Sequence, residues 1–339
     1  MYQIKELLNP NSNIQKLDLV SFKLGVESSR LLIECLKKNT TLTELNIRGA
    51  SYYLNFKKLF EALENNRTLV KLNFNNCQVY CTYLTYLADL LETNKTIKEL
   101  YLRSCCITYH GLFDRREQRY LSTILMMNKT LTTLDLRDNC LNNSDMFWIG
   151  NILKHNNSIT KLDLRSNWIY NEGIKLLSNS LKKNYRLNKL CLKSNNIGDK
   201  GVCYLANYLI VNKTLIKLNL GFNKIGDTGA QYLANSLKIN SSLCVLDIDH
   251  NTIGNNGASL LLQALETNKT LVKLYLWKNS IDLSTIKSIG KKVSINRKNK
   301  ERYQCLQILC LKKINKLGRT DEVKKLIPTI YENCLSKYL

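Results

Sequence analysis

The chain has 339 residues, of which 50 are lysine or arginine and 27 are aspartate or glutamate, giving a formal net charge of +23. No stretch approaches the roughly 18 apolar residues that a membrane-spanning helix needs, so the sequence predicts no membrane span. A surface this basic favours acidic proteins, nucleic acid or anionic membranes as partners and excludes strongly basic ones.

The first thirteen residues, 1–13, predict a helical cap in front of the rest of the chain. Ile4 and Leu8 stand seven and three residues before Asn11, a spacing that recurs in later helices. The segment has charges but no apolar core of signal-peptide length. The twelve cysteines are scattered over small-residue positions. Together these features indicate reduced thiols and a cytoplasmic location.

One pattern organises residues 14–295. Its cleanest copy runs from Leu215 to Ile225 and reads L-x-x-L-x-L-x-x-N-x-I. Successive copies are 27 or 28 residues apart, except for one step of 34. A fixed period of this size predicts a solenoid, and this pattern is the leucine-rich repeat, with a short strand and then a helix in each copy. The ten copies begin at Ile14, Leu42, Leu69, Ile97, Leu131, Ile159, Leu187, Leu215, Leu243 and Leu271.

The predicted fold class is therefore α/β, a right-handed horseshoe solenoid of ten leucine-rich repeats of about 28 residues. Copies of this length with a full helix resemble the ribonuclease-inhibitor class of leucine-rich repeats, over roughly residues 1–295. The inhibitor that names the class is acidic and holds basic ribonucleases. A chain of net charge +23 would repel them, so we do not expect ribonuclease inhibition.

An asparagine stands three residues before the first position of every copy, for example Asn184 and Asn240. Several begin N-x-Ser/Thr sequences, but the position recurs where no such sequence follows, which indicates a structural role rather than glycosylation. We expect this asparagine to suit a left-handed turn at the end of each helix. Cys77 and Cys105 replace the second asparagine of the repeat, which closes the turn after the strand.

The fourth copy is six residues longer than its neighbours, and its additional length includes residues 113–120. Insertions in solenoids fall in loops or lengthened helices, often on a binding face. The sequence leaves two interpretations open: a segment that binds a partner, and a longer outer helix that binds none.

The strand positions between the leucines are expected to point to the concave side, where cations recur from copy to copy. Adjacent strands lie ~4.8 Å apart, so like charges form a ladder, which Asp135 and Asp163 offset in part. Towards the C-terminal end, aromatic residues stand beside the cations, as is typical of interface anchors. The candidate partner-binding residues are Arg103, Arg137, Arg165, Lys193, Lys217, Phe222, Lys273, Tyr275 and Trp277.

These residues predict an acidic protein as the partner on the concave face. Nucleic acid is less favoured, because the aromatic residues are few and clustered rather than spread as a stacking platform. A solvated face with internal ion pairs is the alternative that needs no partner.

The sequence contains no catalytic constellation. Its three histidines, His110, His155 and His250, fall in unrelated repeat positions. There is no C-x-x-C pair for zinc and no G-x-x-x-x-G-K-[ST] loop for phosphates. We therefore expect a protein that is not an enzyme and uses no metal or other cofactor.

The repeat pattern ends near Ile295, and residues 296–339 are predicted to form a separate helical segment. A basic connector over 296–302 precedes an amphipathic helix over 305–317. Gly318 ends this helix, and a second helix begins near Asp321 and is interrupted by Pro328. One helix would suffice to cap the last repeat, whereas this segment is longer.

This segment resembles a SOCS box, the module that couples substrate receptors to cullin-RING ubiquitin ligases. That module presents a helix with the pattern small-Leu-x-x-x-Cys-x-x-x-apolar to Elongin C, and residues 305–314 match it. Leu-Gly-Arg follows at 317–319. The segment departs from the module at Leu311, where arginine is usual, and at Ile330, where a second proline is expected. The resemblance implies adaptor contacts by Leu306, Leu309, Cys310, Ile314, Ile327, Pro328 and Leu335.

The resemblance thus implies the substrate-recognition subunit of an Elongin–cullin-RING ubiquitin ligase. The repeats would bind the target, and the C-terminal box would bind the Elongin B–Elongin C pair and a cullin. The alternative is a leucine-rich-repeat scaffold or inhibitor that binds an acidic protein, with the C-terminal helices as a cap. A stand-alone array also resembles effectors that intracellular microbes deliver into the host cytosol.

Overall fold

The computed structural model describes residues 13–19, 25–49, 54–77, 79, 81–105 and 116–316. The predicted N-terminal cap lies outside the described residues except for Asn13. Three candidate adaptor residues, Ile327, Pro328 and Leu335, also lie outside them. The other four, between 306 and 314, fall on the backbone of the last described helix.

Ten short strands form one parallel sheet whose strand order follows the chain. The register pairs the second leucine of each repeat with its equivalents, for example Leu190 with Leu218. Each strand has three residues, so one side chain points inwards between two that face the concave side. The strands are β1 (Lys16–Asp18), β2 (Glu44–Asn46), β3 (Lys71–Asn73), β4 (Glu99–Tyr101), β5 (Thr133–Asp135), β6 (Lys161–Asp163), β7 (Lys189–Cys191), β8 (Lys217–Asn219), β9 (Val245–Asp247) and β10 (Lys273–Tyr275).

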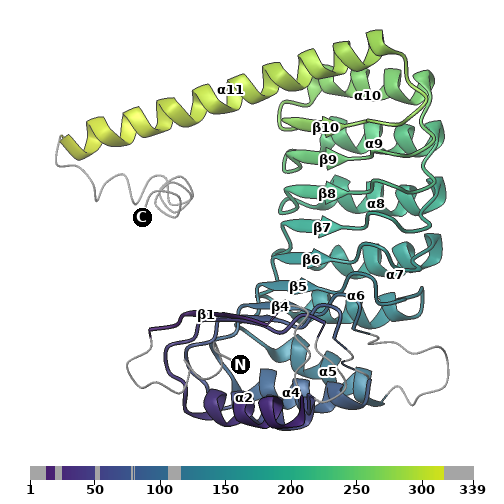
Figure 1. Cartoon of the computed structure of the whole chain (residues 1–339). Coiled ribbons are helices and arrows are strands. Elements are labelled where there is room, and N and C mark those ends of the chain that lie inside the picture. The colour runs from purple at the N-terminus through teal and green to yellow at the C-terminus, as the bar shows by residue number, and fades with distance from the viewer. Residues whose placement is uncertain are drawn as a thin grey trace.

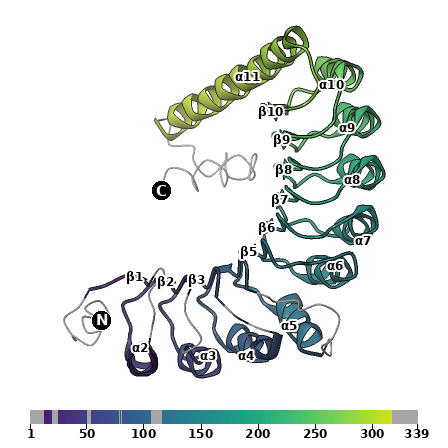
Figure 2. The ribbon, with the colours of Figure 1, turned by 45° about the vertical axis from the view of Figure 1, so that its right-hand side comes forward.

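The helices lie on the outer side of the curved sheet, and the strands line its inner side (Figures 1 and 2). This arrangement confirms the predicted α/β leucine-rich-repeat solenoid. A short 3-10 helix, η1 (Cys81–Tyr83), precedes α4. The α-helices are α2 (Val26–Lys38), α3 (Phe56–Leu63), α4 (Leu84–Thr93), α5 (Arg116–Met127), α6 (Asp145–His155), α7 (Asn171–Leu181), α8 (Asp199–Val211), α9 (Asp227–Ile239), α10 (Asn255–Thr267) and α11 (Leu283–Lys316).

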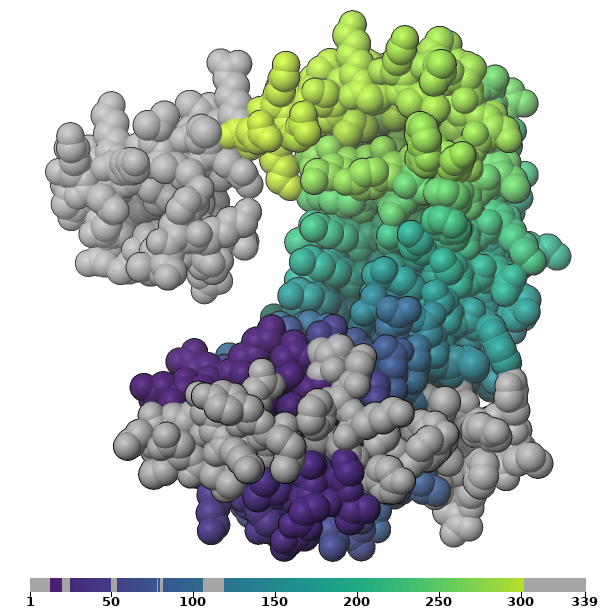
Figure 3. All heavy atoms as spheres, viewed as in Figure 1, coloured from purple at the N-terminus to yellow at the C-terminus, as the bar shows by residue number. Residues whose placement is uncertain are grey.

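The apolar positions of the repeat fill the space between the sheet and the helices. In the eighth repeat Leu215, Leu218, Leu220 and Ile225 are at most 1% exposed. A three-residue strand and one helix cannot bury these side chains alone, so each repeat is stabilised by its neighbours. The described repeats accordingly stack directly on one another in chain order (Figure 3).

The asparagine that ends each helix joins neighbouring repeats through its side chain. Asn240 Oδ1 accepts hydrogen bonds from the backbone N–H groups of Ser242 and Leu243, at 3.0 and 2.8 Å. Its Nδ2 donates to the carbonyl oxygens of Leu209 and Asn212 in the preceding repeat, at 2.7 and 3.1 Å. Equivalent bonds recur at positions 94, 156 and 268. The predicted structural role is confirmed.

The backbone conformation of this asparagine differs from the prediction. Asn240 has φ −68° and ψ 128°, which is extended rather than left-handed backbone. Its side-chain bonds turn the chain from helix to strand, so no left-handed residue is needed there. The left-handed region is occupied where the chain leaves the strand, as at Ser194 and Phe222 with φ of 54° and 56°.

The second asparagine of the repeat closes this turn after the strand. Asn223 Nδ2 donates to the carbonyl oxygen of Leu220 at 2.9 Å and to that of Leu192 in the preceding repeat at 3.0 Å. Cys77 acts in the same way, because its thiol donates to the Ile47 carbonyl oxygen at 2.7 Å. The predicted equivalence of cysteine and asparagine at this position is confirmed.

Helix α11 continues through the region where the sequence predicted a connector. Its first turns cover the last repeat: Ile289 and Val293 are buried, and Asn296 Nδ2 donates to the carbonyl oxygens of Asn268 and Leu271 at 2.9 and 3.1 Å. The helix then extends away from the end of the array on the side of the strands (Figures 1 and 2). The predicted connector over 296–302 is wrong, because this charged run contains no glycine or proline to end a helix.

The additional length of the fourth repeat cannot be assigned to a loop or to a helix. Helix α5 is described from Arg116, directly after residues 106–115, which lie outside the described part of the chain. Both interpretations of the insertion therefore stay predictions.

We predict that Asn240→Ala lowers the free energy of unfolding by about 2 to 3 kcal/mol, because it leaves buried backbone groups of Leu243 and Leu209 without partners. Urea unfolding followed by circular dichroism measures this change. The control is Asn157→Ala, at an exposed asparagine, for which we expect about 0.5 kcal/mol or less. Equal unfolding midpoints for the two variants would contradict the proposed link between repeats.

Candidate functional site

Three columns of side chains line the concave face. The first comes from the residue before the second leucine of each repeat, and the sheet register sets Lys189 beside Lys217 in it. The second comes from the residue after that leucine, such as Asp163. The third follows the strand and includes Arg165 and Lys193. Equivalent side chains of neighbouring repeats on this face are therefore separated by the ~4.8 Å between adjacent strands.

In the N-terminal repeats the charges of the first column are paired. Glu44 lies 3.5 Å from the ammonium group of Lys16 and 3.0 Å from that of Lys71, on the two flanking strands. Hydrogen bonds from Asn46 and Lys71 hold the pKa of the Glu44 carboxyl below its usual value. The charges of this part of the face are therefore engaged in internal ion pairs.

The three arginines predicted to bind a partner are also engaged by carboxylates. Arg137 Nη2 lies 2.6 Å from Asp135, and Arg165 Nη2 lies 2.8 Å from Asp163. Arg103 is paired with an aspartate of the next repeat. The hydrogen bond to Asp135 raises the pKa of Arg137 above its usual value. In this middle part, the concave face therefore fits the alternative expected from the sequence, a face with internal ion pairs.

Lysines of the sixth to eighth repeats differ, and we call Lys161, Lys189 and Lys217 the lysine ladder. They stand in register on β6, β7 and β8. None of the ion pairs found among the described residues includes them. Burial, followed by repulsion from Lys217 and Lys161, lowers the pKa of Lys189. Two unit charges at this separation repel by about 1 kcal/mol in water and several times that near a protein surface.

An aromatic ledge of Phe222, His250, Tyr275 and Trp277 lies at the C-terminal end of the face. The rings of Phe222 and His250 stack with centroids 3.7 Å apart, and Lys193 Nζ lies 4.5 Å from the centroid of the Phe222 ring. Tyr275 and Trp277 are 44% and 67% exposed. The expected clustering of aromatic residues beside cations is present, whereas partner binding by them stays a prediction.

A hollow of about 450 Å³ is lined by the three lysines of the ladder, by Asn219 and by Tyr275, its one lining residue from this ledge. Its lining also includes further charged residues: Asp135, Arg137, Asp163, Arg165 and Asp247. Lys161 and Lys189 were absent from the candidates predicted from the sequence. The signal was available, because three successive copies carry lysine in one column with no acidic residue between them.

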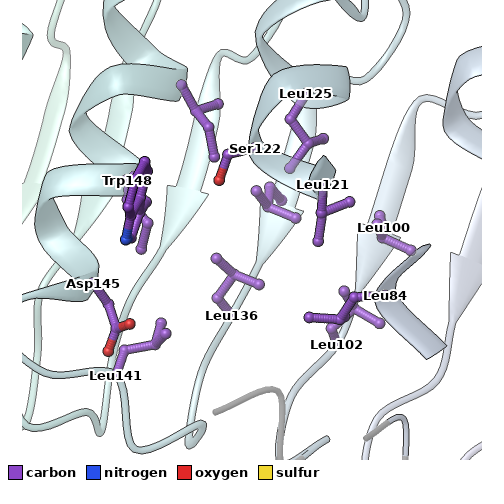
Figure 4. Close-up of a pocket in the computed structure, with 13 residues that line it drawn as sticks. Leu84, Leu100, Leu102, Leu121, Ser122, Leu125, Leu136, Leu141, Asp145 and Trp148 are labelled. Carbon is purple, nitrogen blue, oxygen red and sulfur yellow. The ribbon is translucent and has the colours of Figure 1, made fainter. Parts of the chain in front are cut away.

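A second, apolar pocket of about 70 Å³ lies between the fourth and fifth repeats. Leu121 and Leu125 of α5 face Trp148 of α6 across it, and Leu100 and Leu136 come from the strand side (Figure 4). Residues 106–115, between β4 and α5 in the chain, lie outside the described residues, and we assign the pocket no ligand.

Within the described ranges, no group of three or more histidine, cysteine or acidic side chains is placed to hold a metal ion. The helices of the same ranges include none that is long and apolar enough to cross a membrane. His155 lies on α6, and His250 belongs to the aromatic ledge, whereas His110 lies outside the described residues.

Comparison with known proteins supports the repeat assignment. Six segments match the family model described as Leucine Rich repeat, at residues 93–113, 128–147, 155–178, 187–206, 211–234 and 240–262. No curated protein sequence matches the chain. The fold and these segments together show a solenoid of leucine-rich repeats.

Solved structures with similar architecture include actin-associated and bacterial proteins. The chain is 23% identical to the actin-binding site 2 of leiomodin-1, over 47% of this chain and 93% of that one, with a TM-score of 0.43. The chain is 13% identical to the tropomodulin C-terminal domain of Caenorhabditis elegans, over 48% of this chain and 98% of that one, with a TM-score of 0.41. It is 19% identical to an internalin from Listeria monocytogenes, over 85% of this chain and 87% of that one, with a TM-score of 0.43. Actin binding is a property of leiomodin-1 and is not a finding about this chain.

We predict that Lys189→Gln raises the free energy of unfolding by about 0.5 to 1 kcal/mol at low salt, because it removes like-charge repulsion across the sheet. The gain should shrink in about 1 M NaCl, where charges are screened within ~3 Å. Urea unfolding at the two salt concentrations measures it, with the exposed Lys224→Gln as the control. A loss of stability at low salt would mean that the ladder is compensated by a contact we have not identified.

Proposed function

We propose that this leucine-rich-repeat protein is an adaptor with two docking elements, the concave face of the repeats and the projecting end of α11. The repeats would hold a protein target. The helix end would bind Elongin C and so bring the target to a cullin-RING ubiquitin ligase. Repeat arrays of this kind are protein-binding scaffolds, and the assignment to a ubiquitin ligase depends on the last helix.

The observation that carries the proposal is the length of α11 beyond the array. A solenoid needs its last apolar face covered, and Ile289, Val293 and Asn296 complete that cover. The next five residues, 297–301, are all exposed, and the helix continues to Lys316. Within this stretch Lys300 Nζ still donates to Cys244 Sγ of the ninth repeat, at 3.0 Å. A helix that served only as a cap would have no use for this extension.

The extension has the backbone that the predicted docking motif requires. Leu306, Cys310 and Ile314 fall within α11 at intervals of four residues, and Leu309 is three residues after Leu306. Helix-in-groove recognition uses anchors at these intervals, since they recur on one side of a helix. The remaining adaptor positions, Ile327, Pro328 and Leu335, are supported by the sequence resemblance alone.

The alternative is a scaffold or inhibitor in which the C-terminal helices are a cap. The contacts of Asn296 with Asn268 and Leu271 favour it for the first part of α11. The exposed residues after Asn296 argue against a role as a cap for the remainder of α11. In either case the concave face would bind an acidic protein.

We predict that the intact chain co-purifies with the Elongin B–Elongin C pair and that Leu306→Asp abolishes this capture without lowering the melting temperature of the repeats. The charged side chain would enter an apolar groove, where an unpaired carboxylate is strongly disfavoured. The matched control is Ile308→Asp, because residue 308 lies about 200° around the helix from residue 306.

Three results would reject the ligase assignment. The intact chain could fail to capture the pair. Ile308→Asp could lose capture as fully as Leu306→Asp, which would remove the face-specific role. Leu306→Asp could unfold the repeats, measured by circular dichroism on heating, in which case this part of the helix belongs to the cap.

A further inference from the structure

We infer that the lysine ladder is the point on the concave face where a short acidic segment of the target protein binds. The inference deepens the proposed function, because it rests on the repeats holding a protein target. It names the chemistry of that target: two or three carboxylates close together in sequence, next to an apolar side chain.

Unlike the paired charges of the N-terminal and middle repeats, the ladder lysines make no ion pair among the described residues. Glu44 stands between Lys16 and Lys71 in the same column and pairs with both. At the corresponding places of the sixth to eighth repeats, lysine follows lysine on adjacent strands. Like charges in register on adjacent strands destabilise a sheet. An acidic ligand that neutralises the lysines would relieve this repulsion, and the relief would add to its binding free energy.

The site is bounded, and its bounds limit the size of the ligand. Val245 follows Lys217 in the column, and Thr133 precedes Lys161, so the cationic run has three members. In the second column Asp163 and Asp247 flank the middle of the ladder, and the residues between them, Cys191 and Asn219, are uncharged. The face therefore offers room for a small cluster of carboxylates over β7 and β8, between Asp163 and Asp247.

This boundary favours a protein segment over nucleic acid. A phosphate backbone carries its charges in an unbroken row, and a groove that tracks it is positive along its length. A nucleic-acid strand crossing this face would meet Asp163 beside Lys161 on β6, Asp135 on β5 and Asp247 on β9, which line the same hollow as the ladder. Carboxylates confined to one stretch of a peptide avoid these aspartates.

The aromatic ledge supplies a second anchor beside the charges. Tyr275 lines the same hollow as Lys189 and Lys217. Beyond it, Trp277 and the stacked Phe222 remain largely exposed. Aromatic side chains surrounded by polar neighbours are typical binding hot spots. An apolar residue next to the acidic cluster would pack there.

The test uses a fluorescently labelled alanine-based helical peptide with three glutamates spaced four residues apart and a terminal leucine. Such glutamates lie about 5–6 Å apart, close to the spacing of the lysines. Fluorescence anisotropy at low salt measures binding to the full chain. We expect Lys161→Gln/Lys189→Gln/Lys217→Gln to weaken binding about tenfold or more, since three charged contacts are lost.

A second triple variant keeps the net charge equal: Lys182→Gln/Lys183→Gln/Lys200→Gln. These lysines are exposed on or beside the outer helices α7 and α8, and we expect binding to change by less than about twofold. Equal weakening by both triple variants would overturn the inference, because the attraction would then follow net charge alone. Absence of binding to the intact chain, or equal binding of a peptide with glutamine in place of glutamate, would also overturn it.

A uridine oligonucleotide of about the same number of charges tests the other class of ligand. Tighter, ladder-dependent binding of this RNA than of the peptide would overturn the assignment to a protein segment. The outcome is independent of the Elongin experiment. Peptide binding without Elongin capture would support the acidic-segment site on the ladder and reject the ligase assignment. Elongin capture without peptide binding would reject the ladder site alone.

Discussion

The structure depends on hydrogen bonds that side-chain amides make across the boundary between repeats. Where a helix turns into a strand, the chain leaves backbone groups that regular structure cannot satisfy. Asn240 satisfies groups of its own repeat through Oδ1 and of the preceding repeat through Nδ2. A carboxamide can do both at once, because its oxygen accepts and its separate NH₂ group donates. Leucine burial is non-directional, so by itself it would hold neighbouring repeats together without fixing their relative orientation.

This constraint explains why the concave face can carry chemistry freely. The buried leucines and boundary asparagines determine the position of each strand, so the residues between them contribute little to the fold. The first half of the array uses them for ion pairs, such as Glu44 with Lys71. The second half leaves Lys161, Lys189 and Lys217 without such partners among the described residues, at a cost in stability. This like-charge repulsion is not needed for the fold, and a bound acidic ligand would relieve it.

Much of this could be predicted from the sequence, because a repeat that recurs at a constant period specifies its own fold. The role of Asn240 followed from its recurrence, but its extended backbone did not, since that depends on which groups its side chain reaches. The pairing of Arg165 with Asp163 depends on side-chain rotamers. The stacking of Phe222 on His250 was available in principle, because they are one period apart and share a position. The continuity of α11 was missed by treating a run of charges as a loop.

The unbroken course of α11 means that anything bound near its end is held at a defined place relative to the concave face. From Asn296 to Leu306 the chain advances ten residues, which is about 15 Å along the helix axis. Each residue also turns the helix by about 100°, so adding or deleting one residue in this stretch would point a docked protein in another direction. In the proposed adaptor, the helix would act as an arm of set length and direction, and its geometry would determine which surface of a bound target faces the protein docked on the arm.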